Sequence, residues 1–188
     1  MAGIKLDRRV RNTKALLRGA LVDILQDKPV GRIHVNEICA KAGVNRGTFY
    51  AHYTDVQDLQ EQVFAEFLGK IGELMDSSSP TPGSPESIVK LTRILRFVYD
   101  NRRLALALLG ENSSIASQEA VLRFIREKQV FAHFPVPPEQ EAFLYRFTAA
   151  GCLSVLREWM AHGTESPETI SRLLMQTLCA GMSNFFVQ

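Results

Sequence analysis

Long apolar runs are missing from this sequence, and nothing in it approaches the roughly 18 uninterrupted apolar residues of a membrane-spanning helix. Its first segment, MAGIKLDRRVRNTK, is polar and basic and lacks the apolar stretch of a secretory signal. We therefore expect a cytoplasmic protein with no membrane partner. Cysteine is scarce as well. The three cysteines lie far apart in apolar context, which favours buried, reduced thiols over a disulfide or a metal site.

Signatures of catalysis are also missing. The sequence has no glycine-rich phosphate loop and no serine nucleophile elbow. Its four histidines show no spacing to Cys, Asp or Glu that would give a metal site on the expected helices. We therefore predict a protein that is not an enzyme and that needs no cofactor and no metal.

Alternating runs of β-branched residues are absent, and apolar residues recur instead at the three- and four-residue steps of helices. This spacing predicts helices over residues 7–26, 35–42, 46–53, 56–75, 86–100, 102–110, 117–134, 139–162 and 167–186. Proline and glycine end several of them, and the low-complexity segment SSSPTPGSPES, residues 77–87, is expected to be a loop. The predicted fold class is all-α, with about nine helices.

Charge is distributed unevenly along the chain. The net charge is only +2, but residues 1–54 contain ten Lys or Arg against four acidic residues, which leaves the remainder acidic. This asymmetry favours a polyanion-binding N-terminal domain, residues 1–54, carried by a second helical domain, residues 55–188. A basic face that only meets solvent would produce the same asymmetry.

Residues 35–53 have the form of a helix-turn-helix motif, in which Gly43-Val44-Asn45 joins two short helices. The second helix of this motif enters the major groove of DNA. Asn45 is a favourable N-cap for that helix. The helical period places Val44, Phe49 and Tyr53 on the packing side. The open side then holds the remaining polar or small residues, namely Asn45, Arg46, Gly47, Thr48, Tyr50 and His52.

These residue types suit particular groups of DNA. Arg46 can bond guanine bidentately, and Thr48 can contact a base edge or a thymine methyl. Hydroxyl and imidazole groups can hold phosphates, and a glycine lets the DNA come close. The candidate contacts of this segment are therefore Asn45, Arg46, Gly47, Thr48, Tyr50, His52 and Tyr53. The alternative is an ordinary surface helix of a helical bundle.

The segment IHVNEICAKAGVNRGTFYAHYTDVQDL resembles the DNA-binding segment of TetR/AcrR-family bacterial regulators, with its alanine-glycine-valine turn and its glycine-threonine-phenylalanine-tyrosine helix. The resemblance covers about residues 8–60. Further on, AGCLSVLREWMAHGTESPETISRLLMQTL resembles a C-terminal type of the same family. The resemblance implies a three-helix DNA-binding domain, a C-terminal region that dimerises and binds a small-molecule effector, and a palindromic operator of double-stranded DNA.

Three positions depart from the family pattern. His34 stands where the family usually has a threonine cap for the second helix, although Glu37 can still supply half of a capping box. Val56 replaces a frequent lysine at the start of the fourth helix, and Ala51 fills a slot often held by a long polar residue. These departures predict weaker phosphate binding without a change of fold.

A basic cluster precedes the motif. Arg8, Arg9 and Arg11 would form an arm, and similar regulators use such arms on the minor groove or on flanking phosphates. Lys14 is expected on the first turns of the first helix, where it could meet the DNA backbone. Arg8, Arg9 and Lys14 are therefore further candidate DNA contacts. A disordered solubilising tail is the alternative.

The last two predicted helices offer a surface for pairing with a second copy of the chain. Large apolar and small residues gather there: Phe143, Phe147, Ala150, Gly151, Ser154, Val155, Leu173, Leu174, Leu178, Gly181 and Phe185. A monomeric core would use the same residues. The preceding helices are expected to enclose an effector pocket. Polar groups that could face inward are Tyr99, Arg96, Asn101, His133 and Arg146, and none of them is singled out as an effector contact.

The sequence thus predicts a homodimeric one-component transcriptional regulator, a repressor that a small-molecule effector releases from its operator. One alternative is a TetR-like partner or co-activator protein that no longer binds DNA. Another is a helical ligand carrier or enzyme in which the motif is incidental, and a catalytic constellation would be its mark.

Overall fold

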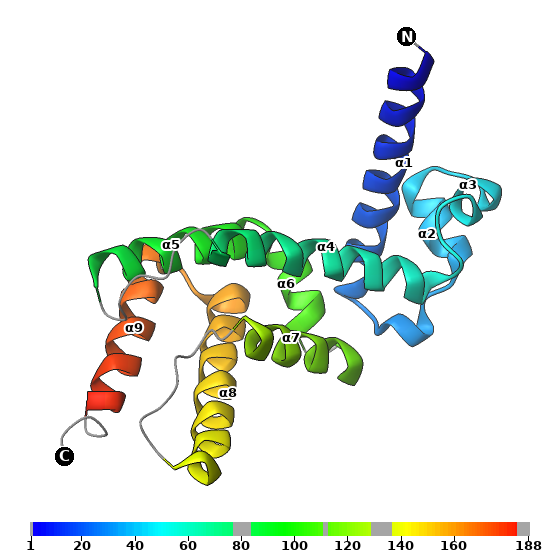
Figure 1. Ribbon diagram of the computed structural model, residues 1–188. Helices are drawn as coiled ribbons and strands as arrows, with labels where there is room; N and C mark the ends of the chain where they lie inside the picture. Colours follow the sequence, from blue (N-terminus) through cyan, green and yellow to red (C-terminus); the bar gives the residue numbers. More distant parts are fainter. Residues whose placement is uncertain (1, 77–83, 111–112, 129–136, 184–188) are drawn as a thin grey trace.

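The computed structural model describes residues 2–76, 84–110, 113–128 and 137–183, and every regular element in these ranges is helical (Figure 1). The elements are α1 Ala2–Leu25, the 3-10 turn η1 Val30–Arg32, α2 Val35–Ala42, α3 Arg46–Tyr50, α4 Val56–Asp76, α5 Pro85–Asp100, α6 Arg102–Leu109, α7 Ile115–Glu127, α8 Pro138–His162 and α9 Pro167–Ser183. The all-α prediction is confirmed.

Side-chain caps fix where several helices begin. The hydroxyl of Ser84 accepts a hydrogen bond from the backbone N–H of Ser87 at 3.2 Å before α5. The hydroxyl of Ser114 accepts one from Ser117 at 3.0 Å before α7. Each cap satisfies a donor that the first helical turn leaves without an intrahelical partner.

The N-terminal core forms where α1, α2, α3 and α4 meet. Leu17, Leu21, Ile38, Phe49 and Leu59 are completely buried there. Their spacing along each helix puts one apolar face inward, so the burial of these faces holds the short helices α2 and α3 in place.

The C-terminal core is built around α5, which packs on α9 and on α4. Tyr99 of α5 stacks on Trp159 of α8 with ring centroids 4.9 Å apart. The indole Nε1 of Trp159 donates to the carbonyl oxygen of Glu165 at 2.9 Å, which ties the end of α8 to the turn before α9. Arg96 forms an ion pair with Glu168 across α5 and α9.

Contacts between α1 and α6 join the two cores. The carboxylate of Asp23 pairs with Arg103 at 2.7 Å and with Lys41 of α2 at 3.6 Å. The side-chain amide of Gln26 donates to the carbonyl oxygen of Arg103 at 3.0 Å. In Figure 1, α4 and α5 run along the molecule, α2 and α3 lie at one end, and α8 and α9 lie at the other.

The helix boundaries differ from the sequence-based expectation at two places that matter for the site. α1 begins at Ala2 rather than near residue 7, because the segment after Gly3 contains good helix formers and no breaker. Arg8 and Arg9 of the basic arm are therefore helical, and they do not form a disordered tail. α3 ends at Tyr50 rather than Tyr53.

Other expectations fall partly outside the described residues. Residues 77–83 of the expected loop, 129–134 of the expected seventh helix and 184–186 of the last one are not among them. Ser87, which the sequence assigns to the loop, belongs to α5 and is buried. In the part of the chain that is described, no helix is long and apolar enough to cross a membrane.

The five polar groups expected to face inward have different positions. Arg96 is exposed in its ion pair, Tyr99 stacks on Trp159, and Asn101 donates its side-chain amide to the carbonyl oxygen of Phe97 at 2.8 Å. His133 lies outside the described residues. Arg146 is exposed on α8.

The three cysteines are free thiols, as the sequence predicts. Cys39 is buried, whereas Cys152 and Cys179 are half-buried. Burial raises the pKa of Cys39 and of Cys152, so both thiols stay protonated near neutral pH.

Candidate nucleic-acid interface

The turn between α2 and α3 depends on a left-handed glycine. Gly43 has φ +67° and ψ 32°, the conformation in which a helix commonly ends. The backbone N–H of Val44 then bonds back to the carbonyl oxygen of Cys39 at 3.0 Å. This geometry stops α2 and turns the chain so that α3 can start at Arg46, three residues after Gly43.

Asn45 caps α3, as the sequence predicts. Its side-chain oxygen accepts hydrogen bonds from the backbone N–H of Thr48 at 2.8 Å and from the hydroxyl of Thr48 at 3.1 Å. A Cβ atom at Gly47 would lie 3.3 Å from the same oxygen. Glycine at this position therefore protects the cap as well as leaving the outer surface open.

Arg46 and Tyr50 form a pair on the exposed side of α3. The guanidinium carbon of Arg46 lies 5.7 Å from the centre of the Tyr50 ring, and its Nη2 donates to the Tyr50 hydroxyl at 3.4 Å. Tyr50 is 50% exposed, while its neighbour Phe49 is completely buried. Stacking limits the conformations that a long arginine side chain can adopt, so the guanidinium is held over the open side.

Tyr53 does not belong to the open side. It is only 5% exposed, and burial is the main cause that raises the pKa of its hydroxyl. Its ring lies 5.8 Å from that of Phe49, and the ammonium of Lys14 is 5.6 Å from its centre. The packing-side assignment of Tyr53 is confirmed, and its assignment as a DNA contact is corrected because the ring is part of the core. His52 is half-buried beside it.

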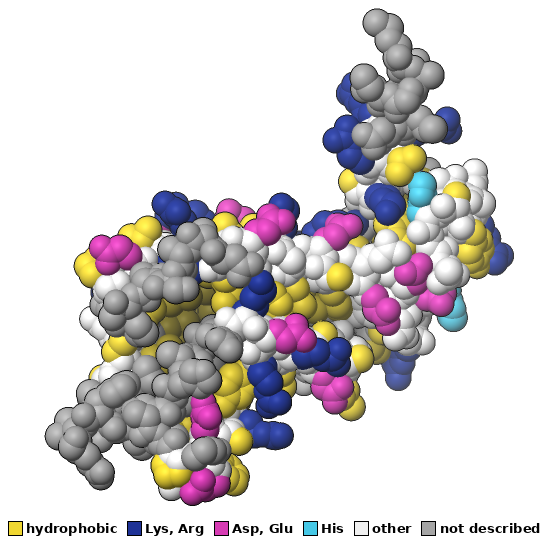
Figure 2. All heavy atoms as spheres, viewed as in Figure 1, with side chains coloured by type: hydrophobic (Ala, Val, Ile, Leu, Met, Phe, Trp, Pro, Cys, Tyr) yellow, Lys and Arg dark blue, Asp and Glu magenta, His cyan; other side chains and the backbone are white. Residues whose placement is uncertain are grey.

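The basic residues of α1 are carried on a protruding helix. The N-terminal part of α1 extends beyond α2 and α3 (Figure 1), and basic side chains surround it in Figure 2. Arg8 and Arg9 are exposed there, whereas Lys14 is half-buried between α1 and the Tyr53 ring. Lys14 lies in the fourth turn of α1 rather than its first turns, because α1 begins earlier than expected.

The start of α2 keeps half of a capping box. The backbone N–H of His34 donates to Glu37 at 3.0 Å, as expected for the departure at His34. Glu37 also forms an ion pair with Lys28. The hydrogen bond from Lys28, followed by that from His34, lowers the pKa of the Glu37 carboxyl, so this carboxylate stays charged at neutral pH.

Of the other two departures, Val56 has a structural explanation, and Ala51 has none. Val56 is 9% exposed and packs in the core, so this position points inward at the start of α4. The start of α4 is held by Asp55 and Asp58: Asp55 accepts from the backbone N–H of Asp58, and Asp58 accepts from that of Thr54, both at 2.8 Å. Ala51 is exposed just past the end of α3.

The geometry suits an anionic polymer and offers little to a metal. A short helix presents an arginine, a tyrosine hydroxyl, a glycine and a capped N-terminus on one surface, and phosphate and base edges are the groups that such donors recognise. In the described ranges, no group of three or more His, Cys, Asp or Glu side chains is placed to hold a metal ion.

Comparison with known proteins points the same way. A family model of TetR type, described as "Transcriptional regulator C-terminal region", matches residues 87–179. The chain is 30% identical over 99 residues to the uncharacterized HTH-type transcriptional regulator YxbF of Bacillus subtilis, a match that spans 52% of this chain and 26% of that protein. It is 24% identical over 124 residues to the HTH-type transcriptional regulator AcrR of Shigella flexneri, covering 63% and 58% of the two chains.

The chain spans only part of these curated relatives: 26% of the length of YxbF and 58% of the length of AcrR. The fold is shared more widely. A TetR transcriptional regulator from Streptococcus agalactiae superposes with a TM-score of 0.68 at 18% identity, over 95% of this chain and 99% of that one. With a helix-turn-helix motif at one end and a matching C-terminal region at the other, the chain belongs to the TetR/AcrR family of transcriptional regulators.

Proposed function

We propose that this protein is a one-component transcriptional regulator that binds a two-fold operator as a homodimer, with α3 of each subunit in a major groove. The observation that carries the proposal is the Arg46–Tyr50 pair, which is held on the exposed side of a helix whose other face is buried. Arg46 would read a guanine, Thr48 a neighbouring base edge, and Tyr50 and His52 would hold phosphates.

Residues of α1 would extend the contact. Arg8 and Arg9 are exposed on the protruding part of the helix, on the same end of the molecule as α3 (Figure 1). Guanidinium groups bind phosphate strongly and without regard to sequence. We therefore assign Arg8 and Arg9 to DNA backbone contacts, while the half-buried Lys14 contributes charge beneath the surface.

Pairing of two subunits would use α8 and α9. Phe143 and Phe147 are 75% and 79% exposed on α8, and Leu173 is 50% exposed on α9. Large apolar side chains exposed together mark an interaction surface, and small residues beside them, here Ala150, Gly151 and Ser154, allow close helix approach. Leu174 is buried in the core of its own chain and is removed from the predicted interface, and Phe185 lies outside the described residues.

Repression would be relieved by an effector that binds the C-terminal helices and changes the separation of the two α3 helices. The contacts of Arg103 in α6 with Asp23 in α1 and with Gln26 just after α1 give such a change a route to the DNA-binding end. A two-fold operator requires both α3 helices to meet their half-sites in register, so a small displacement of one α3 helix can prevent simultaneous binding. The coupling is reciprocal: an effector that weakens DNA binding is itself bound more weakly by the DNA complex.

A mobility-shift titration over a salt series, with the DNA upstream of the protein's own gene, tests this function. We expect two subunits per site and affinity that falls steeply with salt. Arg46→Ala should cost about 1–3 kcal/mol at the operator and relax one base position. Arg93→Ala, an exposed arginine of α5, is the matched control and should bind like wild type.

Two outcomes would contradict the proposal. If the Arg46→Ala variant bound operator and scrambled DNA equally well, and as tightly as the wild type does, Arg46 would have no role in base recognition. A folded dimer that shifts no DNA even at low salt would instead support a TetR-like partner or co-activator protein.

A further inference from the structure

A groove between α7 and α8 lies far along the chain from the helix-turn-helix motif. It has a volume of about 570 Å³ and is lined by Glu119, Leu122, Arg123, Arg126, Tyr145, Arg146, Ala149 and Ala150. Sites for small organic molecules commonly have volumes of about 300–1,000 Å³. The volume of the groove falls within this range, so it is large enough to hold a small organic ligand.

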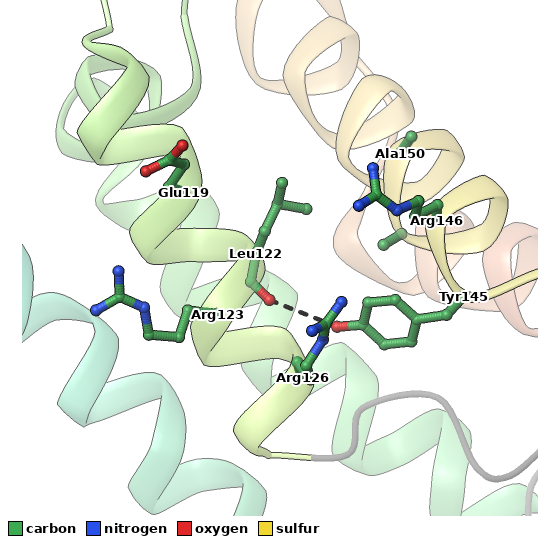
Figure 3. A pocket seen from close by; sticks show the side chains of 8 residues that line it. Glu119, Leu122, Arg123, Arg126, Tyr145, Arg146 and Ala150 are labelled. Carbon is green, nitrogen blue, oxygen red and sulfur yellow. Dashed lines mark hydrogen bonds between the residues drawn. The ribbon is translucent and has the colours of Figure 1, made fainter. Parts of the chain in front are cut away.

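Two arginines converge on this groove from opposite walls. Figure 3 shows Arg126 and Leu122 of α7 extending towards α8, and Arg146 and Tyr145 of α8 extending towards α7, while Glu119 and Arg123 lie on the other side of α7. The guanidinium carbon of Arg126 lies 5.4 Å from the centre of the Tyr145 ring. Stacking on this ring holds Arg126 at the groove, as a preformed site requires.

The charge of the groove is not compensated from within the described part of the chain. Neither Arg126 nor Arg146 pairs with a carboxylate among the described residues, and Glu119, the acidic residue of the lining, lies with Arg123 on the other side of α7. In Figure 2, basic side chains lie on the surface where α7 and α8 face each other. A guanidinium presents a planar fork of donors that matches a carboxylate or a phosphate.

The rest of the lining is apolar. Leu122 and Ala150 offer exposed hydrocarbon, and the Tyr145 ring adds an aromatic wall, whereas Ala149 is completely buried. Burial raises the pKa of the Tyr145 hydroxyl, which stays neutral and donates to the carbonyl oxygen of Leu122 at 3.5 Å. The groove thus combines two cationic donors with an apolar surface, which suits an anionic head joined to an apolar body.

We propose that the α7–α8 groove binds a small organic anion, with a carboxylate or phosphate head held by Arg126 and Arg146 and an apolar body against Leu122, Ala150 and Tyr145. That this anion is the effector rests on the regulatory function proposed above. That the groove binds an anion depends only on the residues of the groove. α8 carries both this groove and the exposed Phe143 and Phe147, so occupancy can act on the pairing surface through one rigid helix.

Calorimetric titration of the full-length protein, without DNA, tests the site with five probes: 2-naphthoate, 2-naphthyl phosphate, the neutral 2-naphthamide, inorganic phosphate, and dodecanoate as a carboxylate of different shape. We expect saturable binding of at least one organic anion, about tenfold or more tighter than the amide and than inorganic phosphate, since a charge-assisted bidentate contact is worth about that factor. Whether naphthoate or naphthyl phosphate binds tighter identifies the head group.

Variants locate the site. Arg126→Gln and Arg146→Gln should each weaken the preferred anion about tenfold, and Arg146→Lys should recover part of the loss by restoring the charge. Arg93→Gln on α5 is the control and should bind as wild type does. Unchanged circular dichroism shows that each variant is folded, as expected for an exposed arginine such as Arg146.

Three results would overturn the proposal: no saturable binding of any organic anion at about 1 mM, equal binding of naphthoate and naphthamide, or wild-type affinity in both arginine variants. The titration contains no DNA, so it tests the site apart from the regulatory function. If the protein binds the anion but shifts no operator DNA, the proposed site stands and the proposed regulatory function is contradicted. An anion that binds through both arginines and also weakens the operator complex supports the two proposals together.

Discussion

Asn45 serves the fold and the proposed interface with different atoms. Its side-chain oxygen accepts from the backbone and the hydroxyl of Thr48, so it caps α3 and orients Thr48 at once. Only the amide N–H groups of Asn45 remain available for DNA. In the proposed complex, base recognition would therefore fall mainly on Arg46, and Asn45 would contribute chiefly by holding a helix of only five residues in place.

Asn45→Ala should lower the free energy of unfolding by about 1 kcal/mol, the usual cost of losing an N-cap side chain. Denaturant unfolding followed by circular dichroism measures it. The matched control is Asn36→Ala, since Asn36 is exposed within α2 and caps nothing, and its effect should stay within about 0.5 kcal/mol. Equal stability of the two variants would show that the cap does not hold α3.

Tyr50→Phe should weaken DNA binding to a similar degree for every sequence. The variant loses a hydroxyl that can bond a phosphate and that also accepts from Arg46, but it keeps the ring on which Arg46 stacks. Mobility shifts on operator and scrambled DNA, with the buried Tyr53→Phe as the control for loss of a tyrosine hydroxyl, give the measurement. A loss confined to one operator base would instead make Tyr50 a base-reading residue.

At the scale of elements, the helix-turn-helix unit depends on the angle between α2 and α3, which Gly43 sets. α2 was predictable to the residue because its apolar spacing, its acidic first turn and the glycine after it agree. The end of α3 was not, because Tyr53 continues the apolar period although the helix has already stopped at Tyr50. The periodicity of a short segment cannot distinguish helix from a turn that packs its aromatic ring inward.

The α7–α8 groove shows a second limit of the sequence. Arg146 could be named as a polar group on an apolar helix, but Arg126 and Tyr145 carried no signal of their own. They become a site only when α7 and α8 face each other, and the pairing of two helices is decided by tertiary packing. The helix spacing nevertheless predicts that Leu122 and Arg126, four residues apart, share one face.

Gly43→Ala should destabilise the protein by about 1–2 kcal/mol, the cost of holding a residue with a Cβ in the left-handed region. Space is not the cause, because a Cβ at Gly43 would meet nothing within 4 Å. Gly31→Ala is the control: it has the same free space without a positive φ, so it should be neutral or slightly stabilising. Thermal unfolding of both variants compares the two costs, and equal melting temperatures would mean that the turn tolerates another conformation.

At the scale of the whole molecule, the proposed function gives the two ends separate tasks that only a dimer would combine. One end carries α3 and the basic part of α1, and the other carries α8 and α9 with their exposed apolar residues (Figure 1). A single α3 helix contacts few base pairs, so useful specificity for a DNA sequence requires two α3 helices at a fixed separation. The exposed phenylalanines of α8 are therefore as necessary to the proposed function as Arg46.

Phe147→Asp tests that dependence, because it places a charge where a 79% exposed aromatic ring would be buried against the second subunit. We expect size-exclusion chromatography with light scattering to change from two chains to one, and operator binding to become weak, non-specific and still salt-dependent. Ile115→Asp is the control, since Ile115 is 78% exposed at the start of α7, outside the proposed interface. If Phe147→Asp remains a dimer while keeping wild-type operator affinity, subunits pair through another surface, and the separation of the α3 helices must be set there.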